Sequence, residues 1–189
     1  MRKTDITGIR VSELNPYVRQ VHFPDGMNPL NAAVVAANHV PDLVFEEVDH
    51  LPTKILMRRL AQKVGAALLM ATDAGELTMI DVERYDLGDA EPFLGILSAE
   101  ELAAIEKQNP SPQETVQLIT RLIGLENISK RLAISMGQIG LTLGGIAQLG
   151  TTASAGAAYT AVAGRQILLG KGPATGRYKV SPLQILHLQ

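Results

Sequence analysis

The sequence predicts an α/β protein with a small, mostly parallel sheet followed by a helical C-terminal region. Two apolar runs, at residues 43–45 and 66–70, flank a segment with helical periodicity. This order is the signature of a β-α-β crossover, which pairs its two strands in parallel. We therefore expect a Rossmann-like α/β domain over residues 1–90 and a mainly helical extension, packed on it, over residues 91–189.

The residues before the first apolar run have clear local signals. Residues 4–14 show the spacing of an apolar helix face and are closed by an Asn-Pro pair, which disfavours helical backbone. Residues 18–23 alternate apolar and polar side chains, which predicts a strand. After a turn at 24–26, Asn28 is placed to cap a helix whose first turn contains Pro29.

The central stretch contains the predicted crossover and a third strand. The helix between the two apolar runs ends at Gly65, a residue suited to the left-handed conformation that closes many helices. A turn around Gly75 leads into residues 77–85, whose alternation predicts a strand. Asp73 and Glu76 flank this turn and are expected to be solvated.

An acidic cluster follows the first predicted strand directly. It consists of Glu46, Glu47 and Asp49, and the next helix begins immediately after it. In open α/β sheets ligands bind beyond the carboxyl ends of the strands. This cluster is therefore the leading candidate for a functional site, although Asp49 would also be favourable simply as a carboxylate near a helix N-terminus.

The C-terminal half is predicted to be helical. Ser98 and Glu101 have the spacing of a capping box, and Ser129 is placed to cap a later helix. A proline-bearing break at residues 109–112 separates the helix that begins at Ser98 from one at residues 114–123, and the segment that begins at Ser129 follows. Residues 177–180 are expected to add a strand or to cover an edge of the sheet.

A long segment, from Leu132 to Gly164, carries no charged residue. Its length would allow a membrane span of about 20 residues, with a small-residue motif at Gly140 and Gly144 for helix association. Its Gln, Thr and Ser content instead favours two buried helices, joined near residues 150–152. Small residues then permit close approach between helices or across a dimer interface.

Composition limits the classes of function. With 17 basic and 19 acidic residues and 4% aromatic residues, the chain lacks the basic surface and stacking platforms of nucleic-acid-binding proteins. It has no cysteine, which excludes thiolate zinc sites and a cysteine nucleophile, and its four histidines, His187 among them, lack ligand spacing. No apolar segment follows the basic first residues, so a cytoplasmic location is expected.

Several motifs occur in an order that resembles a known family. Lys3 precedes a Leu-Asn-Pro sequence at residues 14–16, and a strand-like segment follows at 18–21. Then come LVFEEVDHLPTK and a further strand before Gly75. In order and spacing these resemble the second half of the ThiF/MoeB/HesA family, the ubiquitin-activating-type adenylyltransferases. The run MATDAGELTMIDVERYD looks like ThiF-type domains of larger bacterial proteins, some joined to nitroreductase-like regions.

The resemblance implies an activity and two site residues. The implied reaction is ATP-dependent adenylation of a carboxylate, such as the C-terminus of a ubiquitin-like sulfur carrier protein. Lys3 matches the family's phosphate-contacting lysine, and Asp49 matches its Mg²⁺-binding aspartate. A cation that stabilises phosphate charge and a hard carboxylate that holds Mg²⁺ suit this chemistry.

The chain departs from the family's pattern at several points. The strand and Gly-rich turn that bind the nucleotide in the family have no counterpart here, so the resemblance is to the C-terminal part only. His50 and Lys54 stand where the family has Asn and Arg. We expect an incomplete domain, inactive alone and adenylyltransferase-like if completed. The alternative is a non-catalytic interaction module with a vestigial nucleotide site, a homo-oligomer formed through the Gly/Ala-rich helices.

Overall fold

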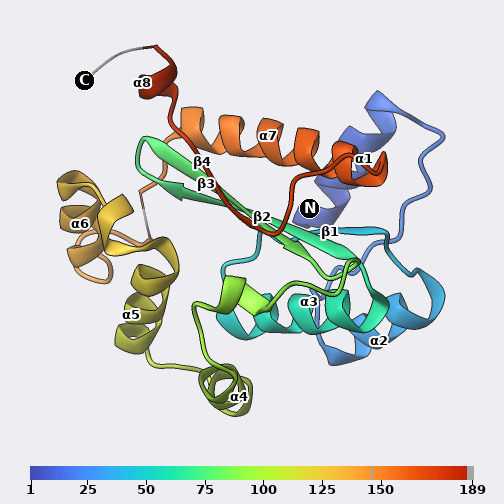
Figure 1. The fold of residues 1–189 in the computed structure, drawn as a ribbon, viewed down its shortest axis with the longest axis horizontal. Helices are drawn as coiled ribbons and strands as arrows, with labels where there is room; N and C mark the ends of the chain where they lie inside the picture. The colour runs from blue at the N-terminus through green and yellow to red at the C-terminus, as the bar shows by residue number, and fades with distance from the viewer. Residues whose placement is uncertain (146, 187–189) are drawn as a thin grey trace. The chain divides into compact units, whose positions relative to one another are not determined.

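The structure of this chain, a computed structural model, describes residues 1–145 and 147–186 (Figure 1). It divides into two compact units, Met1–Val40 and Pro41–Gln189. Each unit is described by itself below.

The first unit contains helices α1 (Lys3–Leu14) and α2 (Pro29–Asn38), as predicted. The backbone N–H of Asn31 donates to Asn28 Oδ1 over 2.9 Å, so the predicted cap is confirmed. The predicted strand at residues 18–23 is wrong, because these residues, all of which are described, form neither strand nor helix. The Gln20 amide instead donates to the Gly8 carbonyl on α1 over 3.2 Å, which holds the segment against that helix.

The second unit consists, in its described residues, of a four-stranded sheet with helices and two short 3₁₀ turns around it. The strands are β1 (Leu43–Phe45), β2 (Ala67–Ala74), β3 (Leu77–Arg84) and β4 (Gly176–Val180). The helices are α3 (Leu51–Val64), α4 (Ala99–Lys107), α5 (Pro112–Ile123), α6 (Lys130–Gly137), α7 (Gly150–Leu168) and α8 (Pro182–Ile185). The 3₁₀ turns are Pro92–Gly95 and Leu125–Asn127.

The direction of the strands corrects the predicted fold. The sheet order is β1-β2-β3-β4, and the predicted crossover is confirmed because β1 and β2 are parallel. However, β2 pairs with β3 and β3 with β4 in antiparallel fashion, so the sheet is mixed and not mostly parallel. Only Gly75 and Glu76 separate β2 from β3, and a two-residue connection can form only an antiparallel hairpin. The broad α/β class is retained.

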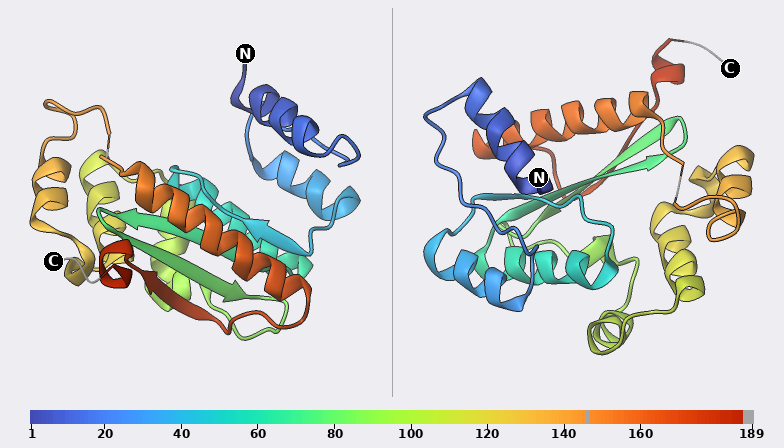
Figure 2. Two further views of the ribbon diagram at one scale, coloured as in Figure 1. Left: turned by 90° about the horizontal axis from the view of Figure 1, so that it is seen from above. Right: turned by 180° about the vertical axis from the view of Figure 1, so that it is seen from behind.

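Helices cover both faces of the sheet, with α3 on one face and α7 on the other (Figures 1 and 2). Successive β2 residues point to opposite faces, as the period of a strand requires. Leu68 packs in one buried cluster with Ala61 of α3, whereas Leu69 packs in another with Ile167 of α7. Burial on both faces explains why β2 is a continuous apolar run in the sequence.

Residues beyond 91 take part in the sheet itself. The predicted strand near residues 177–180 is confirmed as β4, at the edge of the sheet next to β3. The Arg177 guanidinium binds both oxygens of Asp81 on β3, at 2.6 and 2.7 Å, and donates to the Leu122 carbonyl at the end of α5 over 2.7 Å. One side chain thus joins β4, β3 and α5.

The uncharged segment forms part of two helices, α6 and α7, separated by irregular backbone in its described residues. Among the residues that the structure describes, no helix is long and apolar enough to cross a membrane. Three small residues of α7, Gly156, Thr160 and Gly164, lie on its buried face. Their small size allows α7 to lie close to the sheet of its own chain (Figure 2).

We predict that Gly156→Leu destabilises the chain by about 1–3 kcal/mol, as overpacking typically does. A Cβ atom on Gly156 would lie 2.7 Å from Thr78 Oγ1 and 3.3 Å from Ala71 Cβ, and both atoms belong to short side chains on strands. Urea denaturation should show the loss as a lower midpoint. Ala158→Leu is the matched control, because Ala158 is on the same helix but exposed. Equal midpoints for the two variants would contradict close packing of α7 at Gly156.

Candidate active site

A cavity of about 1050 Å³ lies within the second unit, beyond the carboxyl end of β1 and along residues 70–73 of its parallel neighbour β2. Its charged lining residues are Glu47, Asp49, Lys54 and Asp73. The helices α5, α6 and α7 supply apolar lining residues: Ile119, Ile123, Leu132, Met136, Ala157 and Ala161. The cavity therefore has an acidic wall at the sheet and an apolar wall at the helices.

The acidic wall is built by the chain as it leaves β1. The Glu46 N–H donates to the Leu69 carbonyl on β2 over 2.9 Å, which extends the pairing by one residue. Glu47 Oε1 then accepts a hydrogen bond of 2.9 Å from the Ala71 N–H. Asp49 follows on the short loop before α3, and it is exposed at the cavity. The predicted placement of the acidic cluster at the carboxyl edge of β1 is thus confirmed.

Glu46 differs from its acidic neighbours because it is buried and paired. Its Oε1 accepts from Lys54 Nζ over 3.0 Å and from the Val48 N–H over 2.9 Å, and its Oε2 accepts from Arg58 Nη1 over 2.8 Å. The side chains of Glu46 and Arg58 are both 0% exposed. Glu46 therefore fixes the loop that carries Asp49 and does not itself line the cavity.

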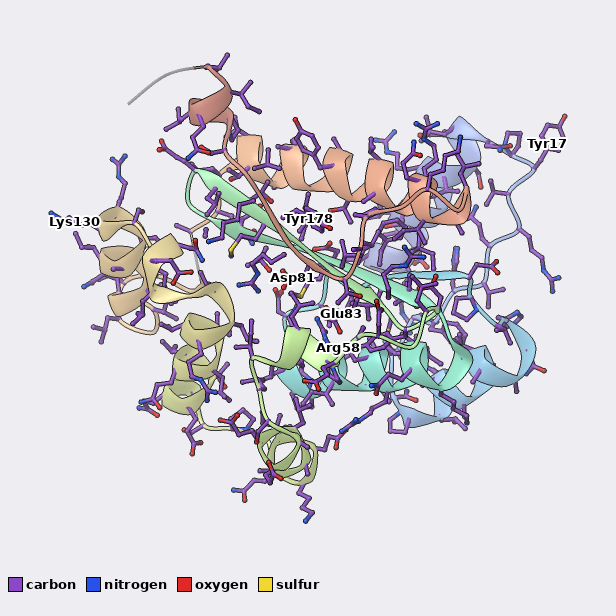
Figure 3. The ribbon with its side chains drawn as sticks, viewed as in Figure 1. Tyr17, Arg58, Asp81, Glu83, Lys130 and Tyr178 are labelled. Carbon is purple, nitrogen blue, oxygen red and sulfur yellow. The ribbon has the colours of Figure 1, made fainter. Side chains whose placement is uncertain are left out.

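Arg58 connects this loop to β3. Its Nη2 lies 2.8 Å from Glu83 Oε1, and its guanidinium lies 3.6 Å from the centre of the Phe93 ring. The Tyr85 hydroxyl donates to the other Glu83 oxygen. Figure 3 shows Arg58 and Glu83 between α3 and the sheet. We call Glu46, Lys54, Arg58, Glu83 and Tyr85 the buried network.

The charges of the buried network balance one another. Burial raises the pKa of the Glu83 carboxyl, and the opposite charge of Arg58 lowers it. Burial also raises the pKa of the Tyr85 hydroxyl, as does the charge of Glu83 beside it, so Tyr85 remains a hydrogen-bond donor. Two cations face two carboxylates. Lys54 is therefore neutralised, and the remaining charge of the cavity is negative.

Glu47 and Asp73 are partly withdrawn from water. Burial raises the pKa of the Glu47 carboxyl, and the charges of Glu46 and Asp73 raise it further, against the lowering effects of the Ala71 N–H and Lys54. Burial likewise raises the pKa of Asp73, which the neighbouring Thr78 hydroxyl lowers. Asp73 and Thr78 are cross-strand partners, and Asp73 Oδ1 and Thr78 Oγ1 are buried together beneath Gly156 of α7, with no further hydrogen-bond partner among the described residues.

The described residues contain no group of three or more His, Cys, Asp or Glu side chains that could hold a metal ion. His187 lies outside the described residues. A Mg²⁺ ion that arrives with a nucleotide needs only one or two protein carboxylates, because phosphate oxygens and water supply the other ligands. The exposed carboxylate of Asp49 fits such a nucleotide-borne ion.

The two residues that the family resemblance singled out lie in different units. Lys3 is the first residue of α1 in the unit Met1–Val40 and is exposed. Asp49 lines the cavity of the unit Pro41–Gln189, together with Lys54, which stands at the family's arginine position.

Sequence reasoning missed two residues of the site. Asp73 was expected to be a solvated turn residue, but it is partly buried in β2 and lines the cavity. β1 pairs only as far as Leu69 on β2, so Asp73 lies beyond the end of β1. Arg58 was not singled out by the sequence. It lies three residues after Ile55, on the buried face of α3, and this spacing could have predicted that Arg58 is buried.

Comparison with known proteins gives one informative match. The chain is 32% identical over 185 residues to the uncharacterized protein MT1398 of Mycobacterium tuberculosis (strain CDC 1551 / Oshkosh). The match covers 95% of this chain and 24% of that protein. The chain thus spans about a quarter of the length of its relative. No model of a known protein family matches the chain.

Proposed function

We propose that this chain forms the Mg²⁺-binding side of an adenylyltransferase-type nucleotide site, of the kind found in the ThiF/MoeB/HesA family. The observation that carries the proposal is the position of Asp49, on the loop after β1 and at the edge of a cavity of about 1050 Å³. Beyond the carboxyl ends of parallel strands is where α/β proteins bind their ligands. The volume lies just above the usual range for small-molecule sites, about 300–1,000 Å³.

The charge of the cavity requires a cation between protein and nucleotide. Glu47, Asp49 and Asp73 would repel a bare triphosphate, and Lys54 is already paired with Glu46. Mg²⁺, when bound, would neutralise phosphate charge and polarise the phosphate oxygens. In this proposal Asp49 holds the ion. A phosphate contact by Lys3 is proposed from its sequence motif alone.

The site is proposed to be incomplete within this chain, because the Gly-rich phosphate-binding half of the family's site has no counterpart in the sequence. Activity as an adenylyltransferase would require another polypeptide segment to supply that phosphate-binding half. The proposed acceptor is the carboxylate of a ubiquitin-like carrier protein, in the cytoplasm. The match to a relative four times as long is compatible with a chain that works beside other segments.

A second candidate function is a non-catalytic interaction module. Tyr159 and Val162 of α7 are 44% and 52% exposed and lie three residues apart, at helical spacing. The small-residue face of α7 packs on its own sheet. A homo-oligomer formed through this helix would therefore use the outer face around Tyr159 and Val162.

We predict that Asp49→Asn weakens Mg²⁺-ATP binding about tenfold or more, since a charge-assisted contact contributes about 1.5–3 kcal/mol. Isothermal titration calorimetry with and without Mg²⁺ measures the effect. The matched control is Asp42→Asn, because Asp42 is an exposed aspartate at the opposite end of β1.

Two results would count against the proposal. Equal affinities of the Asp49 and Asp42 variants would remove Asp49 from the site. An absence of heat with the unmodified chain at millimolar Mg²⁺-ATP would show that the chain alone does not bind nucleotide.

A further inference from the structure

The exposed side of helix α6 and of the turn that follows it combines basic and apolar side chains. It carries Lys130, Arg131, Ile134 and Leu141, and we call these four residues the basic-apolar patch. Ile134 is 70% exposed and Leu141 is 78% exposed. We propose that the basic-apolar patch docks on an anionic lipid surface, with its apolar side chains below the lipid headgroups and its basic side chains among them. This inference does not rest on the proposed nucleotide site.

The first support is the sign of the charge in the C-terminal part of the chain. All 19 acidic residues lie in the stretch from Asp5 to Glu126, whereas six of the 17 basic residues come after it. Glu126 itself pairs with Lys179 at 3.6 Å. Among the residues that the structure describes, no carboxylate oxygen lies within 4.0 Å of Lys130 or Arg131. The patch therefore presents uncompensated positive charge, which anionic lipids attract.

The second support is the orientation of α6. Leu132 is 5% exposed and packs in one buried cluster with Met79 of β3, which fixes the inner side of the helix. Ile134 follows Leu132 by two positions, about 200° around a helix, and therefore points outward, as does Arg131 three positions before it. Figure 3 shows Lys130 on the side of α6 away from the sheet. Helices that lie in a membrane interface also combine basic and exposed apolar side chains.

The third support is the turn that presents Leu141. The Gly140 N–H donates to the Leu143 carbonyl over 2.9 Å. The Leu141 N–H donates to the Gln138 carbonyl over 3.1 Å. The turn thus satisfies these backbone N–H groups internally and leaves the Leu141 side chain exposed. This arrangement suits a lipid surface, because a polar group without a hydrogen-bond partner is costly to remove from water.

Other occupants fit the patch less well. Proteins that bind single-stranded nucleic acid stack its bases on aromatic side chains, and residues 130–145 contain no aromatic residue. A second copy of the chain in an isologous contact would bring Lys130 and Arg131 of both copies together, and like charges repel. A lipid surface matches both the positive charge and the apolar side chains.

Vesicle co-sedimentation tests the proposal with the full chain, without nucleotide or Mg²⁺. Vesicles of phosphatidylcholine alone are compared with vesicles of about three parts phosphatidylcholine to one part phosphatidylserine. We expect at least about tenfold tighter binding to the anionic vesicles, and a loss of this preference at high salt. Equal binding to the two kinds of vesicle, or no binding to the anionic ones, would overturn the proposal.

A pair of double variants locates the charge. Lys130→Gln with Arg131→Gln should weaken binding to anionic vesicles about tenfold or more, because two cations near the lipid surface are lost. Lys63→Gln with Lys107→Gln is the matched control, since it removes two exposed lysines outside the patch. Salt screens charges that lie far from the lipid, so this control should bind almost as the unmodified chain does. Equal losses in the two double variants would contradict a contact at α6.

The apolar contact has its own pair of variants. Leu141→Ser should weaken vesicle binding about tenfold, because an apolar side chain is no longer removed from water. Leu14→Ser is the control, since Leu14 is 89% exposed but lies on α1 in the first unit. If both leucine variants bound vesicles as the unmodified chain does, Leu141 would not enter the lipid.

Two further measurements test the competing occupants. A dimer in gel filtration that Leu141→Ser makes monomeric, in a chain that ignores vesicles, would assign the patch to a second copy. A single-stranded oligonucleotide that binds the chain and prevents vesicle binding would assign it to nucleic acid. Either result would overturn the lipid proposal. Because no nucleotide cofactor is present in these experiments, failure here leaves the Asp49 prediction untouched.

Discussion

Replacing Arg58 with methionine is expected to lower the free energy of unfolding by about 3–5 kcal/mol, the usual effect of removing one partner from a buried ion pair. The Arg58 side chain is 0% exposed and binds both Glu46 and Glu83, which are also 0% exposed. Methionine fills a similar volume but leaves Glu83 without its cation. Chemical denaturation followed by circular dichroism measures the loss.

The neighbouring arginine provides the control. Arg59 is on the same helix, but its side chain is 43% exposed and pairs with Glu106, whose side chain is 37% exposed. Arg59→Met should therefore change stability by less than about 1 kcal/mol, because exposed ion pairs contribute little. Similar losses in the two variants would indicate an effect of the helix in general and not of the buried network.

The Arg58 variant should also depend on pH in a defined direction. Without Arg58, the folded-state pKa of Glu83 should rise further above its ordinary value of 4.5. A carboxyl whose pKa is raised in the folded state destabilises the fold as pH rises through that pKa, and the effect disappears below the unfolded pKa. The difference between wild type and variant should therefore shrink as pH falls from 7 toward 4.5. A difference that stays constant over this range would contradict a buried, uncompensated Glu83.

Phe93→Ala is expected to cost about 3–5 kcal/mol, the range for truncating a buried aromatic residue. Phe93 is 1% exposed and packs in one cluster with Leu51 and Ile55 of α3, and its ring also lies against Arg58. Alanine leaves a cavity at this position and removes the ring from the guanidinium. Guanidinium chloride denaturation should show the loss as a lower midpoint.

Leu94→Ala is the matched control for Phe93. Both residues have left-handed backbone, with φ of 53° and 55°, so any effect of alanine on this conformation is shared by the two variants. Leu94 is only partly buried, and we expect a loss well below that of Phe93. If the two variants lost the same stability, the turn and not the Phe93 ring would be the important feature.

Arg58 also affects the candidate site. Arg58 holds Glu46, and Glu46 accepts the N–H of Val48 on the loop before Asp49. Arg58 is therefore a positioning residue for Asp49.

The sequence alone determined the features that depend on neighbouring residues. The capping hydroxyls of Ser98 and Ser129 accept the expected backbone N–H groups of Glu101 and Leu132, and Gly65 ends α3 with a φ of 67°. The β1-α3-β2 crossover was also predictable, because its two apolar runs and the helix between them are continuous in the chain. The capping signals act within a few residues, and the crossover signal lies in one continuous stretch of chain.

Only the tertiary structure decided the rest. Sheet direction depended on which strands pair, and β4, more than ninety residues after β3, completes a mixed sheet. Asp73 became a cavity residue because β1 stops short of it and α5, α6 and α7 close the space around it. Charged residues such as Arg58 are buried only where partners from other elements meet them, and Glu46 and Glu83 lie 12 and 25 residues away in the sequence. Local patterns specify elements, whereas the energy of a buried charge depends on what the folded chain places around it.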